Sequence, residues 1–249
     1  MKKLTLLLLA LLYVTLTYAY TERDLLQKQA DINRLKEILV LDRQWVTYPD
    51  YNDRAGWDRF LGTFKDEYIR RGEKRLNYQW QVVKATDYLA FERTGNRQIM
   101  EKPFGANNGA IADLLMAELA EGKGRFVDQL INGVFNACEM TSWALAAHII
   151  VQPSHRALPA YDYPVIDLTS GDLGGLLAWT YHFMRPSFDK VDPEISRRLR
   201  HELQTRILDP YMNNDSFWWM GRNYNGRMLN NWNPWCNSNA CLLYTSDAA

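Results

Sequence analysis

Asparagine and tryptophan side chains gather near the end of the chain, in the stretch NNWNPWCNSN from residue 230 to residue 239. Each carboxamide can donate and accept hydrogen bonds, and each indole ring offers a flat apolar face. Such groups suit a sugar ring, whose C–H face stacks on an aromatic ring while its edge carries hydroxyls. The alternative is a polar loop in which asparagines satisfy backbone groups and adopt left-handed turns.

A second concentration of aromatic and polar residues is CEMTSWALAAH, from Cys138 to His148. On one helix, Glu139 and Trp143 are four residues apart, and His148 lies roughly 140° farther round. Trp143 and His148 are candidate substrate-binding residues, and Glu139 is a candidate catalytic carboxylate. The alternatives are a structural histidine in the core and a buried glutamate held by a neighbouring loop.

The third candidate is DSFWWMGRNYNGRM, which leads into the asparagine cluster and combines tryptophans with Arg222 and Arg227. A guanidinium beside aromatic rings suits an acidic sugar, because it pairs with a carboxylate or sulfate through two parallel hydrogen bonds. Arg222 is therefore a candidate substrate-binding residue. The alternative is a hydrophobic helix end whose arginines reach solvent.

Composition narrows the possible partners and cofactors. The 249 residues carry 29 Lys and Arg against 29 Asp and Glu, so no global field draws nucleic acid to the chain. Three cysteines without a CxxC motif and four histidines without an HExxH motif favour neither a disulfide framework nor a zinc site. The sequence thus predicts no metal, no cofactor and no nucleic-acid partner.

Residues 1–19 are typical of an export signal. Two lysines precede an apolar run from Leu4 to Leu16, and Thr17-Tyr18-Ala19 matches a small-x-small cleavage site. The apolar run is shorter than the about 20 residues that a membrane-spanning helix needs, which disfavours a retained anchor. We expect an exported protein, periplasmic or secreted, whose mature chain begins at Tyr20 and does not stay in the membrane.

The elements that must position these side chains are helices, because apolar residues recur at spacings of three and four. We expect one helix within residues 53–76, one from Asn107 or Asn108 to Gly122, and one from Arg125 to about Val151. Two more are expected, one within residues 168–184 capped by Thr169 or Ser170, and one capped by Asp192 with Pro193 in its first turn and Pro210 at its end.

Short connections, EGKG and RPSFDKVD, make successive helices antiparallel neighbours. The predicted fold class is therefore all-α, a series of helical hairpins. Two segments rich in Pro, Tyr and Asp, Gln44–Trp57 and Pro153–Val165, are expected to be ordered loops at the ends of helices, where ligand contacts usually lie.

Longer motifs carry a family resemblance. FGANNGAIADLLMAELAEGKGRFVDQLINGVFNACEMTSWALAAH, RILDPYM, FWWM and NNWNPWCNSN resemble the heparinase II/III-like polysaccharide lyases of Bacteroidetes, from about Leu25 to Ala240 and most specifically in NNWNPW. The resemblance implies that the helical hairpins form an incomplete α/α toroid, the N-terminal catalytic domain of such lyases. It also implies a downstream β-sheet domain, which this sequence does not contain.

The resemblance implies β-elimination at a uronic acid, with an acidic polysaccharide such as a glycosaminoglycan as substrate. An amide neutralises the C6 carboxylate, a Tyr or His removes the C5 proton, and a Tyr protonates the leaving oxygen. The neutralising asparagine of related lyases stands directly before a His or Trp, which matches Asn231 before Trp232. Asn231 is thus the expected catalytic residue, with Asn230 and Asn233 orienting it and with Trp232 and Trp235 as walls of the cleft.

The chain departs from the family beyond this motif, where such lyases carry their catalytic tyrosine and a second histidine. The tail CLLYTSDAA, residues 241–249, resembles a translated transposase-adapter sequence. We therefore expect a signal at 1–19, part of a toroid domain at 20–240, and a foreign tail at 241–249, with the natural frame interrupted after Ala240 and the fragment inactive. The alternative is a natural polar C-terminus.

Two other functions stay open. An α/α-barrel glycoside hydrolase needs two carboxylates roughly 5–9.5 Å apart, for which Glu139 and Asp172 are the candidates. A non-catalytic sugar-binding or surface-assembly protein would use the same tryptophans. The products distinguish the enzymes, because only a lyase leaves a C4–C5 double bond.

Overall fold

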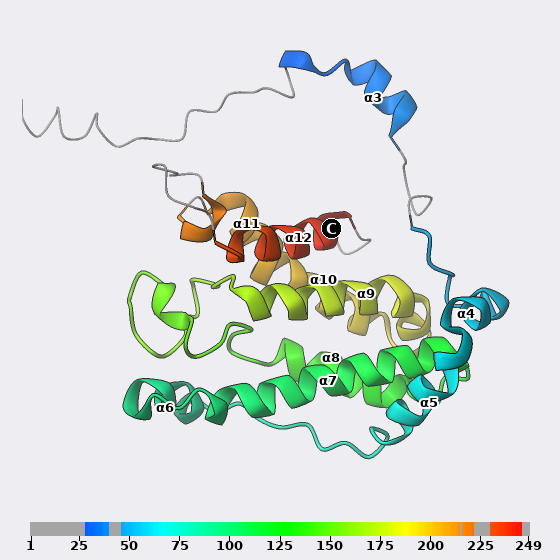
Figure 1. Ribbon diagram of the computed structural model, residues 1–249, viewed down its shortest axis with the longest axis horizontal. Coiled ribbons are helices and arrows are strands. Elements are labelled where there is room, and N and C mark those ends of the chain that lie inside the picture. Colours follow the sequence, from blue (N-terminus) through cyan, green and yellow to red (C-terminus); the bar gives the residue numbers. More distant parts are fainter. Residues whose placement is uncertain (1–27, 40–45, 215, 222–229, 246–249) are drawn as a thin grey trace, which may run out of the picture. The chain divides into compact units, whose positions relative to one another are not determined.

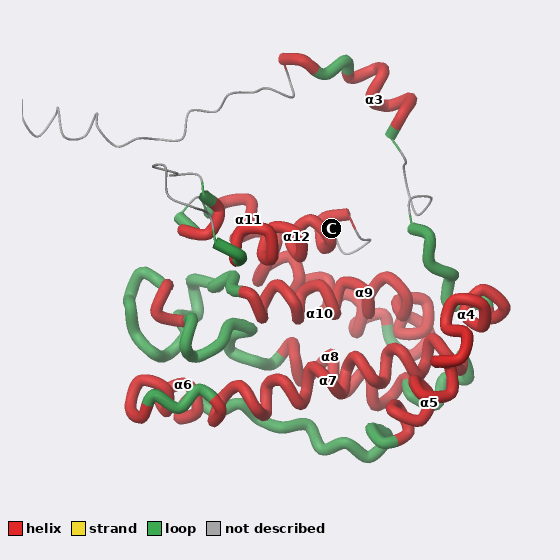
Figure 2. Tube along the Cα trace, viewed as in Figure 1, coloured by secondary structure: helices red, strands yellow, loops and turns green. Residues whose placement is uncertain are grey.

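The computed structural model describes residues 28–39, 46–214, 216–221 and 230–245 (Figure 1). These residues form helices joined by turns and loops, without a strand, which confirms the predicted all-α class (Figure 2). None of the helices among them is long and apolar enough to cross a membrane. The predicted signal, residues 1–19, lies outside the described residues, and export stays a prediction.

The chain divides into two compact units. One comprises Met1–Thr47 and Arg222–Arg227, and the other comprises Tyr48–Gly221 and Met228–Ala249. In the first unit the structure describes α3 (Ile32–Ile38), which begins where the Asp31 carboxylate accepts hydrogen bonds from two backbone amides. The candidate residues that the structure describes all belong to the second unit.

The described helices of the second unit are α4 (Arg54–Leu61), α5 (Lys65–Glu73), α6 (Ala85–Thr94), α7 (Gln98–Glu121), α8 (Val127–Cys138), α9 (Leu168–Val191), α10 (Pro193–Leu203), α11 (Asp209–Asn213) and α12 (Trp232–Thr245). The long helix α7 packs against α5 and α8, and the long helix α9 packs against α10 and α12 (Figure 1). The consecutive helices α7 and α8 thus lie side by side, as the short connection EGKG predicted, and α9 also lies beside α10. Their closure into a toroid stays a prediction.

The helix expected within residues 53–76 is divided in two. α4 ends at Leu61 and is followed by Gly62, whose φ of 52° favours glycine. A 3₁₀ turn, Gly62–Phe64, leads into α5. Trp57 and Leu61 are buried, whereas Phe60 and Phe64 are exposed. The apolar spacing of three and four thus predicted the helical content but not the break.

α7 begins earlier than predicted, at Gln98 rather than after Asn107 or Asn108. Asn107 is buried inside the helix, where its side chain accepts from the Gln81 backbone N–H and donates to the Gln81 carbonyl and to Asn136. An asparagine whose side chain bonds to the backbone of a neighbouring segment cannot be distinguished from an N-cap by sequence alone. The stop at Gly122, with φ of 67°, is as predicted.

The long helix expected from Arg125 to Val151 is wrong. α8 ends at Cys138, and residues 139–148 form turns before a short 3₁₀ helix, Ile149–Val151. In this segment the Leu145 N–H bonds to the buried Asp167 carboxylate, and the Ala144 N–H bonds to the Ser142 hydroxyl. Side chains thus take backbone donors that a helix would have used.

α9 begins after Asp167, which forms a capping box with Ser170, so neither Thr169 nor Ser170 is the cap. The helix continues to Val191 with Pro186 inside it, and the connection expected at 185–192 is therefore wrong. α10 follows with Asp192 as its cap and Pro193 in its first turn, as predicted. A π-helical segment, Gln204–Leu208, then joins α10 to α11, so the helical path does not end at Pro210.

Glu118 of α7 is completely buried and holds the turn between α7 and α8. Its carboxylate accepts hydrogen bonds from the Tyr51 hydroxyl at 2.6 Å, from the Gly124 N–H at 2.8 Å and from the Phe126 N–H at 3.2 Å. Burial, together with the hydrogen bond to Glu118, raises the pKa of Tyr51 to about 12. The phenol therefore stays protonated and able to donate at neutral pH.

Glu118→Gln is expected to lower the free energy of unfolding by about 1–3 kcal/mol, because the amide nitrogen that replaces one oxygen cannot accept from the buried N–H groups. Urea unfolding followed by circular dichroism measures the change. The control is Glu92→Gln at an exposed position of α6, expected to change stability by less than about 0.5 kcal/mol. Equal unfolding midpoints for the two variants would contradict the role of Glu118.

Candidate functional site

The asparagine cluster begins a helix. The Asn230 side chain accepts a hydrogen bond at 3.0 Å from the N–H of Trp232, the first residue of α12. α12 then packs on α9 at glycines that allow close approach, since a Cβ at Gly175 would lie 2.9 Å from Asn239 Oδ1. Cys236 and Leu243 are completely buried on this helix. The polar-loop alternative is therefore wrong about a loop from Trp232 onward, although Asn230 and Asn233 do bond to backbone groups as it expected. α12 includes the first residues of the tail predicted to be foreign.

The helix separates the asparagines into different roles. Asn233 Nδ2 donates to the Trp219 and Met220 carbonyls and thus holds the 3₁₀ turn Trp218–Met220. Asn237 accepts from the Tyr211 hydroxyl at 2.9 Å. Asn231, in contrast, is exposed, and its carboxamide makes no hydrogen bond to a described residue. Of these three asparagines, Asn231 is the one whose amide is available to a ligand.

The Trp232 ring contacts the imidazole of His148. The ring centroids of His148 and Trp232 are 4.7 Å apart at an interplanar angle of 62°. The centroid of the Trp218 ring lies 5.2 Å from that of Trp232. His148 comes from the turns after α8, Trp218 from the 3₁₀ turn, and Trp232 from α12. Segments distant in sequence therefore meet where α12 begins.

The Asp167 carboxylate orients the His148 ring through a contact with Nδ1. The carboxylate is completely buried, and its Oδ2 lies 2.6 Å from His148 Nδ1. It also accepts from the Leu145 and Ser170 N–H groups at 3.0 and 2.7 Å. A carboxylate that accepts the Nδ1 proton fixes the tautomer and leaves the lone pair on Nε2. That nitrogen bonds to no described residue, and 15% of the side chain is exposed to a ligand.

We call this arrangement the His148 site, which consists of Asn231, Trp232, Trp218, His148 and Asp167. The sequence singled out Asn231, Trp232 and His148 but not their contact, and it missed Asp167. The pattern Asp-Leu-Thr-Ser, with Ser170 three residues after the aspartate, is a capping-box signal that could have identified Asp167 as a cap. Nothing in the sequence pointed to its second role at the imidazole.

The other predicted binding residues lie apart from this arrangement or outside the described residues. Trp235 is 43% exposed, and its Nε1 donates to Asp172 of α9. Trp143 is buried, its Nε1 donates to the Ala137 carbonyl, and the Arg206 guanidinium covers its face at 5.2 Å. Arg222 lies outside the described residues.

The two carboxylates considered for a hydrolase have separate partners. The Glu139 side chain is 66% exposed and lies 3.2 Å from the Arg198 guanidinium of α10. Asp172 accepts from Trp235 and Asn239 of α12. They share no partner among the described residues, so the contacts give the paired-carboxylate mechanism no support.

Cysteine reactivity tests the packing of α8 and α12. Burial raises the pKa of the Cys138 and Cys236 thiols to about 12, so almost no reactive thiolate exists near pH 8. We expect an alkylating reagent to modify the exposed Cys241 in the native chain, and the two buried thiols after unfolding in urea. Peptide mass spectrometry measures the order. Equal rates for Cys236 and Cys241 in the native chain would contradict the placement of α12.

Among the described residues, no group of three or more His, Cys, Asp or Glu side chains could hold a metal ion. Comparisons with models of protein families and with curated proteins give no match for this chain.

Proposed function

We propose that the chain carries part of the active site of a polysaccharide lyase that cleaves uronic-acid polymers by β-elimination. The observation that carries the proposal is the contact between His148 and Trp232, with ring centroids 4.7 Å apart. It places an imidazole held by a carboxylate against Trp232, the residue that directly follows the exposed Asn231. The export signal predicted at residues 1–19 suits a substrate that is an extracellular polymer.

In this reaction each polar group has one task. The Asn231 carboxamide donates to the C6 carboxylate of the uronate and stabilises the negative charge that develops as C5 loses its proton. His148 accepts that proton at Nε2, and Asp167 stabilises the imidazolium that forms. The C5–H electron pair becomes the C4–C5 double bond while the bond from C4 to the glycosidic oxygen breaks. Water or an acidic side chain protonates the departing oxygen.

The tryptophans supply the binding surface for the sugar. Trp218 is 53% exposed, and its ring lies at an interplanar angle of 43° to that of the half-buried Trp232. Two tilted indole faces can contact neighbouring residues of a polysaccharide through their C–H surfaces. Arg222, which lies outside the described residues, is the proposed partner for a further carboxylate or sulfate group.

A second candidate function is sugar binding without cleavage. It is favoured by the exposure of two indole side chains, 53% for Trp218 and 43% for Trp235. Such a protein would use the indole faces in the same way and would need neither the orientation of His148 nor its Nε2 lone pair. The held imidazole is the reason that we prefer the lyase.

Two measurements separate these functions. Intrinsic tryptophan fluorescence of the chain, titrated with heparin or chondroitin oligosaccharides, measures binding. The ultraviolet absorbance of the C4–C5 double bond measures cleavage by the chain together with the continuation expected after Ala240. Binding with cleavage supports the lyase, and binding without cleavage supports the binding protein. Absence of both contradicts both functions.

A further inference from the structure

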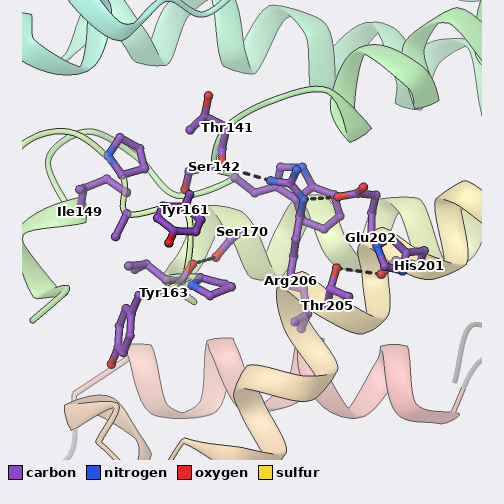
Figure 3. A pocket seen from close by; sticks show the side chains of 16 residues that line it. Thr141, Ser142, Ile149, Tyr161, Tyr163, Ser170, His201, Glu202, Thr205 and Arg206 are labelled. Atoms are coloured by element: carbon purple, nitrogen blue, oxygen red, sulfur yellow. Dashed lines mark hydrogen bonds and ion pairs between the residues drawn. The ribbon is translucent and has the colours of Figure 1, made fainter.

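A polar pocket of about 220 Å³ lies between the turns and loop of residues 141–165 and the helical segment His201–Ile207 (Figure 3). Its polar lining includes Thr141, Ser142, Tyr161, His201, Thr205 and Arg206. None of the five residues of the His148 site lines it. The pocket is therefore a separate feature that the proposed elimination does not use.

One wall of the pocket is the π-helical segment Gln204–Leu208. Thr205, Arg206 and Ile207 of this segment all line the cavity. π-helical turns are rare and occur frequently at functional sites, because the wider turn moves side chains away from the positions of a regular helix. The segment that departs from α-helical geometry therefore lines the cavity.

The charged groups around the pocket neutralise one another. Arg206 pairs with Glu202, which also accepts from Arg198 Nε at 2.7 Å, and Arg198 pairs in turn with Glu139. The remaining donors of the Arg206 guanidinium reach two backbone carbonyls, while its face covers Trp143. Two arginines thus balance two glutamates, and no excess charge would attract an ionic ligand.

Neutral groups with hydrogen-bonding capacity remain for a ligand. The side chains of Thr141 and Tyr161 and the imidazole of His201 make no hydrogen bond to a described residue, and the Ser142 oxygen accepts from the Ala144 N–H while its proton has no described acceptor. Tyr161 is 94% exposed and presents its ring at the pocket (Figure 3). The lining therefore matches a molecule that has several hydroxyls and one apolar C–H face.

We propose that this pocket binds a single neutral sugar ring, at a site separate from the His148 site. The volume agrees with one ring, since it is below the about 300–1,000 Å³ of pockets for drug-sized ligands. Tyr161 stacks on the C–H face, while Thr141, Ser142 and His201 bind hydroxyls at the ring edge. The proposal does not depend on lyase activity.

The four histidines of the chain allow a direct test. His201 lines the pocket and His148 belongs to the other site, so the imidazole signals of histidine-labelled protein report on each site separately by NMR. Methyl β-glucoside, titrated over a millimolar range, is expected to shift the His201 signal to saturation and to leave the His148 signal in place. The variants His201→Gln and His148→Gln assign the two signals.

Two variants connect the shift to the pocket. Tyr161→Ala and Thr141→Val change exposed side chains and are each expected to weaken the apparent affinity by about threefold or more. The control Phe64→Ala changes an exposed aromatic residue outside the pocket and is expected to leave the affinity unaltered.

Three results would overturn the proposal. The first is a His201 signal that does not move with methyl β-glucoside. The second is an affinity that is the same in Tyr161→Ala as in the parent chain. The third is a His201 shift caused by glucuronate or sulfate but not by the neutral glycoside, which would identify an anion site. Loss or presence of β-elimination changes none of these readouts, so this proposal and the lyase function can fail independently.

Discussion

Asp167→Ala is expected to lower the free energy of unfolding by about 3–5 kcal/mol, the range for removing one partner of a buried polar pair. The carboxylate is completely buried and accepts from four donors: the His148 ring and the Leu145 N–H of the turns after α8, and the Ser170 N–H and Thr169 hydroxyl of the first turn of α9. Without it, those donors are buried without an acceptor and α9 loses its N-cap.

Urea unfolding followed by circular dichroism measures this loss, and Asp162→Ala is the matched control in an exposed loop. Asp167→Asn tests the geometry further. Its amide oxygen can still cap α9 at Ser170, but its nitrogen cannot accept from Leu145 and His148, so we expect a smaller loss of about 1–3 kcal/mol. The His148 tautomer is expected to change in imidazole NMR spectra. An unfolding midpoint for Asp167→Ala equal to that of Asp162→Ala would contradict this account.

Asn231→Ala is expected to reduce kcat for β-elimination by about 10²–10³-fold in the chain together with its expected continuation, because the variant loses a donor to the developing charge. The stability of the fold is expected to stay the same, since the carboxamide is exposed and bonds to no described residue. The initial rate of double-bond absorbance measures the effect.

The control for this variant is Asn77→Ala, which truncates another exposed asparagine far from α12 in sequence. It is expected to leave kcat unaltered. Should Asn231→Ala keep turnover within a few-fold of the parent enzyme, the neutralising role belongs to another residue. A parallel unfolding measurement separates loss of the reaction from loss of the fold.

Local rules explain what could be predicted about the fold. The stop at Gly122 and the start at Asp192-Pro193 depend on backbone conformation and capping within a few residues, so the sequence identified both. The end of α8 at Cys138 could not be read in this way. It depends on Asp167, which takes the Leu145 N–H across 22 positions of the chain. Side-chain capture of a distant backbone donor leaves no periodic signal.

The candidate site was predicted in pieces. A motif that resembles a lyase family points to Asn231 and Trp232, and the sequence also offers His148. Their spacing in the chain could not reveal that the rings of His148 and Trp232 touch. The asparagine cluster is also ambiguous in sequence, because the contact of Asn239 with the glycines of α9 depends on where α12 packs. Tertiary contact, not composition, decides which asparagine is available.

Asp167 also limits how this chain can change over evolution. One carboxylate determines both where α9 begins and how the imidazole is oriented, so a substitution that retuned His148 would also alter the framework helix. Adaptation to another substrate is therefore expected at the exposed residues of the His148 site, Trp218 and Asn231. Substitutions at exposed side chains cost little folding stability. Within the His148 site, Asp167 is therefore the position expected to vary least.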